Sequence, residues 1–241
     1  MRLPEGILCR STLAGLMLFC LTAGVAAQAD PADLTATASD QPGPEDLFPE
    51  ASAQADPADR MKWFADAKLG IFIHWGIYAV NGIDESWSFY NELISYDDYM
   101  KQLGGFTAEN YEPRQWVKLI KESGARYAVL TSKHHDGVAL WDTKMSRLNT
   151  VDTTPARADL IKPFVRELRR AGLKVGLYYS LLDWSHPDYP NMTRSIKRYS
   201  DDSLRWEGFV RFNHGQISEL AEKFRPCLLY TSDAADEEDS V

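Results

Sequence analysis

The feature that most constrains the fold of this chain is the alternation of short apolar runs with amphipathic helical segments. The runs are rich in β-branched and aromatic residues and nearly continuous in hydrophobicity, which is typical of strands buried on both faces of a parallel sheet. They are Leu69–Trp75, Tyr127–Ser132 and Leu173–Ser180. Helices are predicted where apolar residues recur on one face, and a glycine follows each of the first two. These segments are Pro113–Ser123, Asp159–Ala171 and Ser203–Phe224.

This order of elements predicts βα units joined into a parallel sheet. Long inserts follow the strands, in the position that active-site loops take in a (β/α)₈ barrel. We therefore expect an α/β fold, an incomplete (β/α)₈ TIM-like barrel with about the first three to four βα units. A doubly wound sheet is the alternative. It would require a glycine-rich phosphate loop after the first strand, and the sequence HWGIYAVNG is not such a loop.

The N-terminal residues have the pattern of a secretory signal. Arg2 and Arg10 precede an apolar run over 13–25, and the small residues Val25-Ala26-Ala27 follow. The run is short for a membrane span and suits the apolar region of a cleaved signal. We expect residues 1–27 to be removed, the protein to be secreted or periplasmic, and no membrane association to remain after cleavage.

Residues 28–59 are predicted to form a disordered linker. They are rich in Ala, Asp, Pro and Ser, and the hexapeptide QADPAD occurs at 28–33 and again at 54–59. Such polar repeats bury too little apolar surface to fold. The folded part is expected over 60–226.

Composition narrows the possible functions. The chain has 241 residues, a formal net charge of -9 and scattered basic residues, which argues against nucleic acid as a partner. Two of its three cysteines, Cys9 and Cys20, fall in the predicted signal, leaving Cys227. Neither a disulfide framework nor a cysteine-based metal site is therefore expected.

The residues that point to chemistry follow the predicted strands. His74 ends the first strand, His134 and His135 follow the second, and Tyr178 lies at the end of the third. Polar side chains at the carboxyl ends of barrel strands are typical of an active site. A single histidine there would be explained by core packing, but histidines at matching strand ends favour a binding site.

A metal site built from these histidines is a second possibility. His134 and His135 are neighbours, however, so in an extended strand their side chains would point to opposite faces. The sequence also lacks HxH and HExxH spacings. We therefore expect no metal. A metal-dependent barrel hydrolase and a non-catalytic carbohydrate-binding protein remain as alternative functions.

Several motifs resemble those of one enzyme family. KLGIFIHWGIYAVNG, ESWSFYNELISYDDYMKQ, GARYAVLTSKHHDGVALWDT and GLKVGLYYSLLDW occur in this order. Together they resemble the α-L-fucosidases of glycoside hydrolase family 29, over about residues 61–226. The resemblance implies that 60–226 is part of a catalytic barrel, that the parent enzyme releases terminal α-L-fucose from glycans or other fucosides with retention, and that it needs no cofactor.

The resemblance also assigns roles to residues. It implies that His74, His134 and His135 bind fucose hydroxyls, with Tyr178 near the nucleophile. The family has a Glu-Trp contact after the first strand, whereas this chain has an extra serine between the two residues. It therefore makes Trp87 a candidate to stack on fucose and Glu85 a weaker candidate.

The catalytic carboxylates are missing from the matching positions. The family's nucleophilic aspartate would fall shortly after Pro226, at Ser232 in this chain. Asp136 and Asp183 are expected to be structural. Residues 227–241 are expected to be a non-native tail, and the 241-residue chain to be inactive. The sequence does not indicate an oligomeric state.

Overall fold

A computed structural model describes residues 57–231 of the chain. The chain divides into two units, residues 1–48 and 49–241, and all described residues belong to the second. The predicted signal, most of the predicted linker and residues 232–241 lie outside the described residues. The first helix, α1 (Pro57–Ala67), begins slightly before the expected start of the fold at Arg60.

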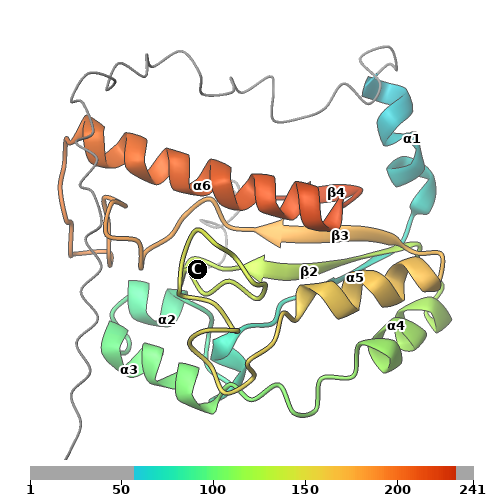
Figure 1. Cartoon of the computed structure of the whole chain (residues 1–241), viewed down its shortest axis with the longest axis horizontal. Coiled ribbons are helices and arrows are strands. Elements are labelled where there is room, and N and C mark those ends of the chain that lie inside the picture. Colours follow the sequence, from blue (N-terminus) through green and yellow to red (C-terminus); the bar gives the residue numbers. More distant parts are fainter. Residues whose placement is uncertain (1–56, 232–241) are drawn as a thin grey trace, which may run out of the picture. The chain divides into compact units, whose positions relative to one another are not determined.

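The centre of the described part is a four-stranded parallel sheet (Figure 1). Its strands pair in sequence order, β1-β2-β3-β4. Their bounds are β1 (Gly70–Ile73), β2 (Tyr127–Lys133), β3 (Lys174–Tyr179) and β4 (Leu228–Tyr230). The first three lie within the predicted strands or extend them by one residue, so the parallel sheet predicted from the sequence is confirmed.

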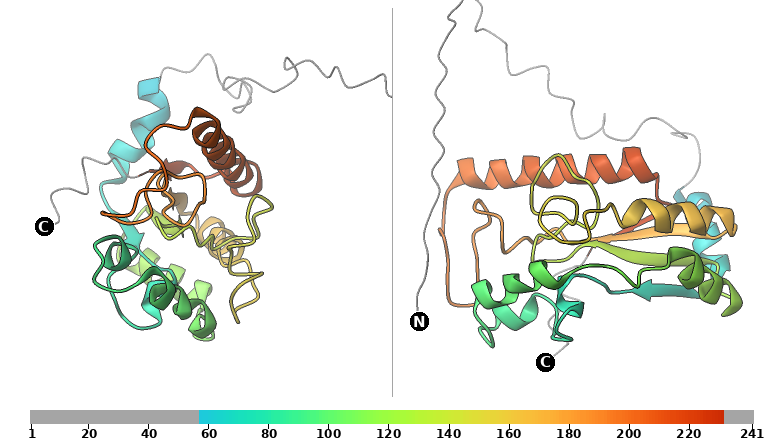
Figure 2. Two further views of the ribbon diagram at one scale, coloured as in Figure 1. Left: turned by 90° about the vertical axis from the view of Figure 1, so that its left-hand side faces the viewer. Right: turned by 60° about the horizontal axis from the view of Figure 1, so that its bottom comes forward.

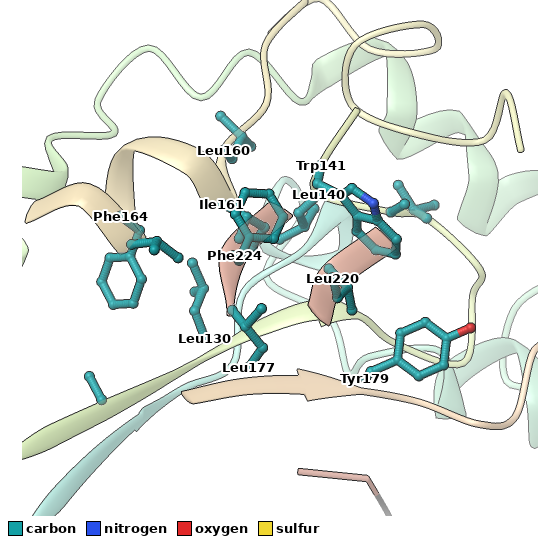
Figure 3. Packing of buried hydrophobic residues seen from close by; sticks show 14 of the residues in the cluster. Leu130, Leu140, Trp141, Leu160, Ile161, Phe164, Leu177, Tyr179, Leu220 and Phe224 are labelled. Atoms are coloured by element: carbon teal, nitrogen blue, oxygen red, sulfur yellow. The ribbon is translucent and has the colours of Figure 1, made fainter. Parts of the chain in front are cut away.

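Three helices cover one face of this sheet, namely α4 (Pro113–Glu122), α5 (Ile161–Arg170) and α6 (Ser203–Phe224). Figure 2 shows α6 running alongside the strands, with α4 and α5 next to each other. Alternate strand residues, such as Leu130 and Leu177, pack against Phe164, Leu220 and Phe224 of the helices in one apolar cluster (Figure 3). Burying side chains of this size contributes about 1.5–3 kcal/mol each before conformational entropy is counted.

Strand order and helix placement together distinguish the two predicted folds. A doubly wound sheet reverses its strand order and has helices on both faces. Here the order runs in one direction, and the three crossover helices share one core with the same sheet face. Right-handed crossovers produce this arrangement when each new strand is added on the same side. The described part is therefore an α/β fold that matches part of a (β/α)₈ barrel.

Short helices fill the loops after β1. They are η1 (Ile77–Ala79), α2 (Trp87–Tyr90), α3 (Tyr96–Met100) and η2 (Lys101–Gly105). Helices α2 and α3 lie beyond the arrowhead of β2 (Figure 1). The loop that was predicted to surround a site at the carboxyl ends of the strands is therefore present there. Among residues 57–231, no helix is long and apolar enough to cross a bilayer.

The strand β4 lies in a segment where no strand was expected. Leu228–Tyr230 pairs in parallel with Gly176–Tyr178 of β3. The acidic run after Ser232 lies outside the described residues. The apolar LLY segment in front of that run takes the position of the fourth strand.

A buried carboxyl group joins α3 to the loop after β2. The hydroxyl of Tyr99 donates to Asp136 Oδ2 at 2.7 Å, and the backbone N–H of Val138 donates to Oδ1 at 2.9 Å. Burial raises the pKa of Asp136 to about 6, although both hydrogen bonds oppose the shift. The geometry agrees with the structural role expected for this residue.

Replacing Asp136 with Asn is expected to change how stability depends on pH. The folded-state pKa lies above the ordinary value of 3.8, so between these values the native state binds more protons than the unfolded state. The free energy of unfolding of the unsubstituted chain should therefore fall as pH rises from 4 to 7, on the order of 2 kcal/mol relative to Asp136→Asn. Denaturant unfolding of both proteins across this range measures the difference.

Tyr99→Phe serves as the companion variant. It removes a hydroxyl that stabilises the ionised carboxylate and so raises the folded-state pKa further; the loss of stability should continue to a higher pH and be larger. Parallel pH profiles for the unsubstituted chain and Asp136→Asn would contradict the buried carboxyl described above.

Candidate functional site

The carboxyl ends of β1, β2 and β3 meet at one edge of the sheet and bring three predicted site residues together. The ring of His74 lies 5.2 Å from that of His134 and 5.4 Å from that of Tyr178, measured between centroids. His134 and Tyr178 are stacked with centroids 5.8 Å apart. These residues are far apart in the sequence, so the sheet creates the cluster.

The expectation that His134 and His135 point to opposite faces is wrong. Their ring centroids lie 4.2 Å apart. The rule applies to extended backbone, but β2 ends at Lys133 and the chain turns, with Gly137 donating its N–H to the carbonyl of His134. Both imidazoles therefore belong to the cluster.

Each imidazole contacts a side-chain oxygen through its Nδ1 atom. His74 Nδ1 lies 3.1 Å from Glu85 Oε1. The other two rings contact serine hydroxyls, with 2.5 Å between His134 Nδ1 and Ser86 Oγ and 2.5 Å between His135 Nδ1 and Ser180 Oγ. These oxygens come from the loop before α2 and from the end of β3.

The charges in the cluster follow from these contacts. The hydrogen bond from His74 lowers the pKa of Glu85, against the opposing effect of its burial. Burial lowers the pKa of His134 well below its ordinary value, and the neighbouring His135 and His74 lower it further. At neutral pH the cluster therefore contains an ionised Glu85 and a neutral His134.

Aromatic rings form one wall of the cluster. Trp87, at the start of α2, lies with its ring centroid 5.7 Å from His135 and 4.9 Å from Trp184. Tyr90 stacks on Trp184 at 4.0 Å with an interplanar angle of 15°. Trp87 is half-buried and is held in place by these contacts. The structure thus places both Glu85 and Trp87, despite the extra serine between them, beside the histidines.

The accessible part of the cluster faces the uncovered side of the sheet. The side chains of His74 and Glu85 are 36% and 33% exposed, whereas His134, His135 and Tyr178 are buried behind them. Phe72 is also exposed on this side and contacts Tyr178 edge-on at 5.8 Å. The arrangement offers hydrogen-bonding groups and aromatic surface within one small region.

Behind this region, Lys133 forms a buried ion pair that sequence reasoning missed. Its Nζ lies 3.2 Å from Asp183 Oδ2 and 3.1 Å from the hydroxyl of Tyr179. The register between β2 and β3 shifts between Thr131 and Lys133. This irregularity places the lysine beside Tyr179, on the helix-covered side. A charged residue in an apolar run was the available signal, because such a residue requires a partner when buried.

Asp183 links the loops after β2 and β3. Besides pairing with Lys133, it accepts the backbone N–H groups of Ser185 and His186 through Oδ1. A Cβ atom on Gly137 would lie 2.5 Å from this Oδ1, and Gly137 has a φ of +76°. These contacts agree with the structural role expected for Asp183, and Gly137 is required for the close approach of the two loops.

The contacts of Ser86 and Ser180 with the imidazoles were also not predicted from the sequence. The extra serine of the ESW segment was visible, but its contact with His134 could not be predicted because they lie 48 residues apart. Within residues 57–231 there is no group of three or more His, Cys, Asp or Glu side chains arranged to hold a metal ion. Ser232, at the expected nucleophile position, lies outside this range.

Comparisons with known proteins agree with this architecture. A family model described as alpha-L-fucosidase matches residues 36–240. An alpha-L-fucosidase from Branchiostoma floridae is 39% identical over 145 residues, which are 53% of this chain and 32% of the relative. The chain thus spans about a third of the length of this curated relative.

Solved structures match a larger share of this chain than the Branchiostoma relative does. Alpha-L-fucosidase isoenzyme 1 from Paenibacillus thiaminolyticus superposes with a TM-score of 0.65 and 36% identity, over 73% of this chain and 43% of that chain. A trapped covalent intermediate of an alpha-L-fucosidase from Bacteroides thetaiotaomicron, in complex with 2-fluoro-fucosyl fluoride, gives 0.62 and 30%, over 74% and 42%. Since the family model covers most of the sequence and the four-stranded sheet matches these enzymes, the chain belongs to the α-L-fucosidase family.

Proposed function

We propose that this chain is the fucose-recognising part of a retaining exo-α-L-fucosidase, and that the parent protein hydrolyses terminal α-L-fucosides of glycans. The observation that carries the proposal is the cluster of His74, His134, His135 and Tyr178 at adjoining strand ends. It occurs in a chain that belongs to the α-L-fucosidase family.

The chemistry of the cluster suits a fucosyl group. Such a sugar presents several hydroxyls and one methyl group on a small ring. Imidazoles and a carboxylate supply directional donors and acceptors for hydroxyls. An aromatic ring such as Trp87 can cover an apolar patch of the sugar. The half-exposed His74 and Glu85 would meet the sugar first, with the buried imidazoles directly behind them.

Hydrolysis with retention requires two further groups. A nucleophilic carboxylate and an acid/base carboxyl must lie about 5–5.5 Å apart across the glycosidic bond. Asp136 and Asp183, the buried aspartates near the cluster, are already engaged by Tyr99 and Lys133. In our proposal, the parent enzyme supplies its catalytic carboxyl groups from other residues. The covalent intermediate of the Bacteroides relative supports double displacement as its mechanism.

We also propose that the protein is exported, because residues 1–27 have a charged start, an apolar run and small residues at their end. Expression of the intact gene in a bacterial host should deliver a product that begins after Ala27 to the periplasm or the medium. Cell fractionation followed by N-terminal sequencing tests this. A product that stays in the cytoplasm and keeps Met1 would contradict export.

Replacing His74 with Ala is expected to weaken the binding of L-fucose at least tenfold. It removes an accessible imidazole and leaves Glu85 without its partner, and a tenfold loss corresponds to about 1.4 kcal/mol. Titration calorimetry on the purified chain measures the affinity. His214→Ala, which changes an exposed histidine on α6, is the matched control and should bind fucose normally. Equal affinities in the two variants would refute the proposed site.

The 241-residue polypeptide itself is expected to show no fucosidase activity. The described residues place no free pair of carboxyl groups beside the histidine cluster, so no route for double displacement exists there. Incubation with a nitrophenyl α-L-fucoside checks this. Release of nitrophenol above that of a mock preparation, lost on substitution of His74, would show the expectation to be wrong.

A further inference from the structure

The buried ion pair of Lys133 and Asp183 connects two segments that line the candidate site. Lys133 is the last residue of β2, and the residues after it form the turn that carries His134 and His135 (the histidine turn). Asp183 directly precedes Trp184, whose ring centroid lies 4.6 Å from that of His135. The pair therefore joins the backbone of the histidine turn to the backbone of the aromatic wall.

The ammonium group of Lys133 is enclosed by the protein. Its side chain is completely buried, with Nζ 3.2 Å from Asp183 Oδ2 and 3.1 Å from the hydroxyl of Tyr179. The ring centroids of Tyr179 and Phe212 lie 4.4 and 5.3 Å from Nζ. Burial lowers the pKa of Lys133, and Asp183 opposes this effect. An ammonium is costly to bury without a partner, so the position of the lysine is tied to that of the carboxylate.

Helix α6 contributes two polar side chains to the same network. The hydroxyl of Tyr179 lies 2.7 Å from Asn213 Oδ1 and 2.9 Å from Gln216 Oε1. Asn213 Nδ2 donates to the carbonyl of Leu181 at 3.0 Å. Both amides are buried in α6, where polar groups are unfavourable unless they are hydrogen-bonded. The helix thus fixes the tyrosine that contacts the lysine.

We propose that Lys133 is a positioning residue for the site, and that its pairing with Asp183 holds the aromatic wall against the histidine turn. The second carboxylate oxygen, Oδ1, accepts the backbone N–H groups of Ser185 and His186 at 3.1 and 2.9 Å. The same carboxylate therefore contacts the lysine and shapes the turn that contains Trp184. This inference rests on the proposed function and extends it to a residue behind the site, on the helix-covered side.

The physical chemistry of buried ion pairs favours positioning over stability as the role of this pair. Removing two charges from water costs about as much as their attraction returns, so well-packed apolar residues often stabilise a fold equally well. An ion pair with hydrogen-bond geometry is directional, however, and requires a defined distance and alignment of its two groups. Lys133 and Asp183 therefore supply a defined spacing between two loops.

The spacing can be tested without ligand in the double variant Lys133→Met/Asp183→Asn. It removes both charges and leaves a side-chain oxygen to accept the two backbone N–H groups. Proton NMR of the unsubstituted chain should show Overhauser contacts between the rings of Trp184 and His135, whose signals are assigned by their loss in Trp184→Phe and His135→Gln. These contacts should weaken at least twofold in the double variant.

Arg170→Met/Glu167→Gln is the matched control. Glu167 is also a buried acid, and its Oε1 lies 2.9 Å from Nη1 of Arg170. Both residues lie near the end of α5, which leads to the start of β3 and not to its carboxyl end. The control makes the same two chemical changes and should leave the Overhauser contacts as they are.

Titration calorimetry with methyl α-L-fucoside measures the effect on the site. The affinity should fall at least tenfold in Lys133→Met/Asp183→Asn and less than threefold in the control, with both proteins shown to be folded by denaturant unfolding. Tyr179→Phe keeps the ion pair but removes one contact of Nζ, so it should lose affinity two- to fivefold. If the double variant does not fold, an unchanged affinity in Tyr179→Phe overturns the proposal.

Two results for the folded double variant would also overturn the positioning role. One is an affinity within threefold of that of the unsubstituted chain, and the other is unchanged Overhauser contacts between Trp184 and His135. Failure of the unsubstituted chain to bind any fucoside is a different outcome. Combined with weakened contacts in the double variant, it would refute the proposed function but not the placement of Trp184 by Lys133 and Asp183.

Discussion

Parallel pairing of the strands in sequence order is the constraint on which the site depends. Parallel strands place their carboxyl ends at one edge of a sheet, and crossovers of constant hand place their helices on one face. As a result, the apolar cluster and the polar cluster occupy different parts of the same strands. Leu130 and Leu177 face the helices, whereas His74 and Tyr178 lie toward the uncovered side. Alternate residues of one strand can therefore contribute to the apolar core and to the histidine cluster.

The polar groups at this edge are arranged in two layers. The half-exposed His74 and Glu85 form the outer layer, and the buried His134, His135 and Tyr178 form the inner one, in which Ser86 and Ser180 contact the two imidazoles. Further from the cluster, Lys133 and Asp183 form a buried ion pair. Breaking such a pair by removing one partner leaves a charge in an apolar environment, which costs about 3–5 kcal/mol. The loops that carry the histidines thus have their own internal support.

The sequence was sufficient to predict the first three strands, the helices α4, α5 and α6 and the histidines, because these depend on local periodicity and on strand ends. Helix α6 has the predicted bounds, and β2 and β3 differ from prediction by one or two residues. The joint position of His134 and His135 was mispredicted, since the alternation rule was applied past the end of β2. The serine partners and the lysine ion pair depend on contacts between distant segments, so no local pattern could reveal them. The strand β4 was missed because its three-residue apolar segment precedes a strongly acidic run.

The contact of Gly137 with Asp183 has a consequence for how this edge of the fold can vary. A side chain at position 137 would occupy the space of the carboxylate that also pairs with Lys133 and caps the turn before His186. The start of the loop after β2 and the start of the loop after β3 are therefore packed together through Gly137 and Asp183. A side chain at position 137 would therefore disturb the start of both loops together, and with them the backbone that carries His134 and His135.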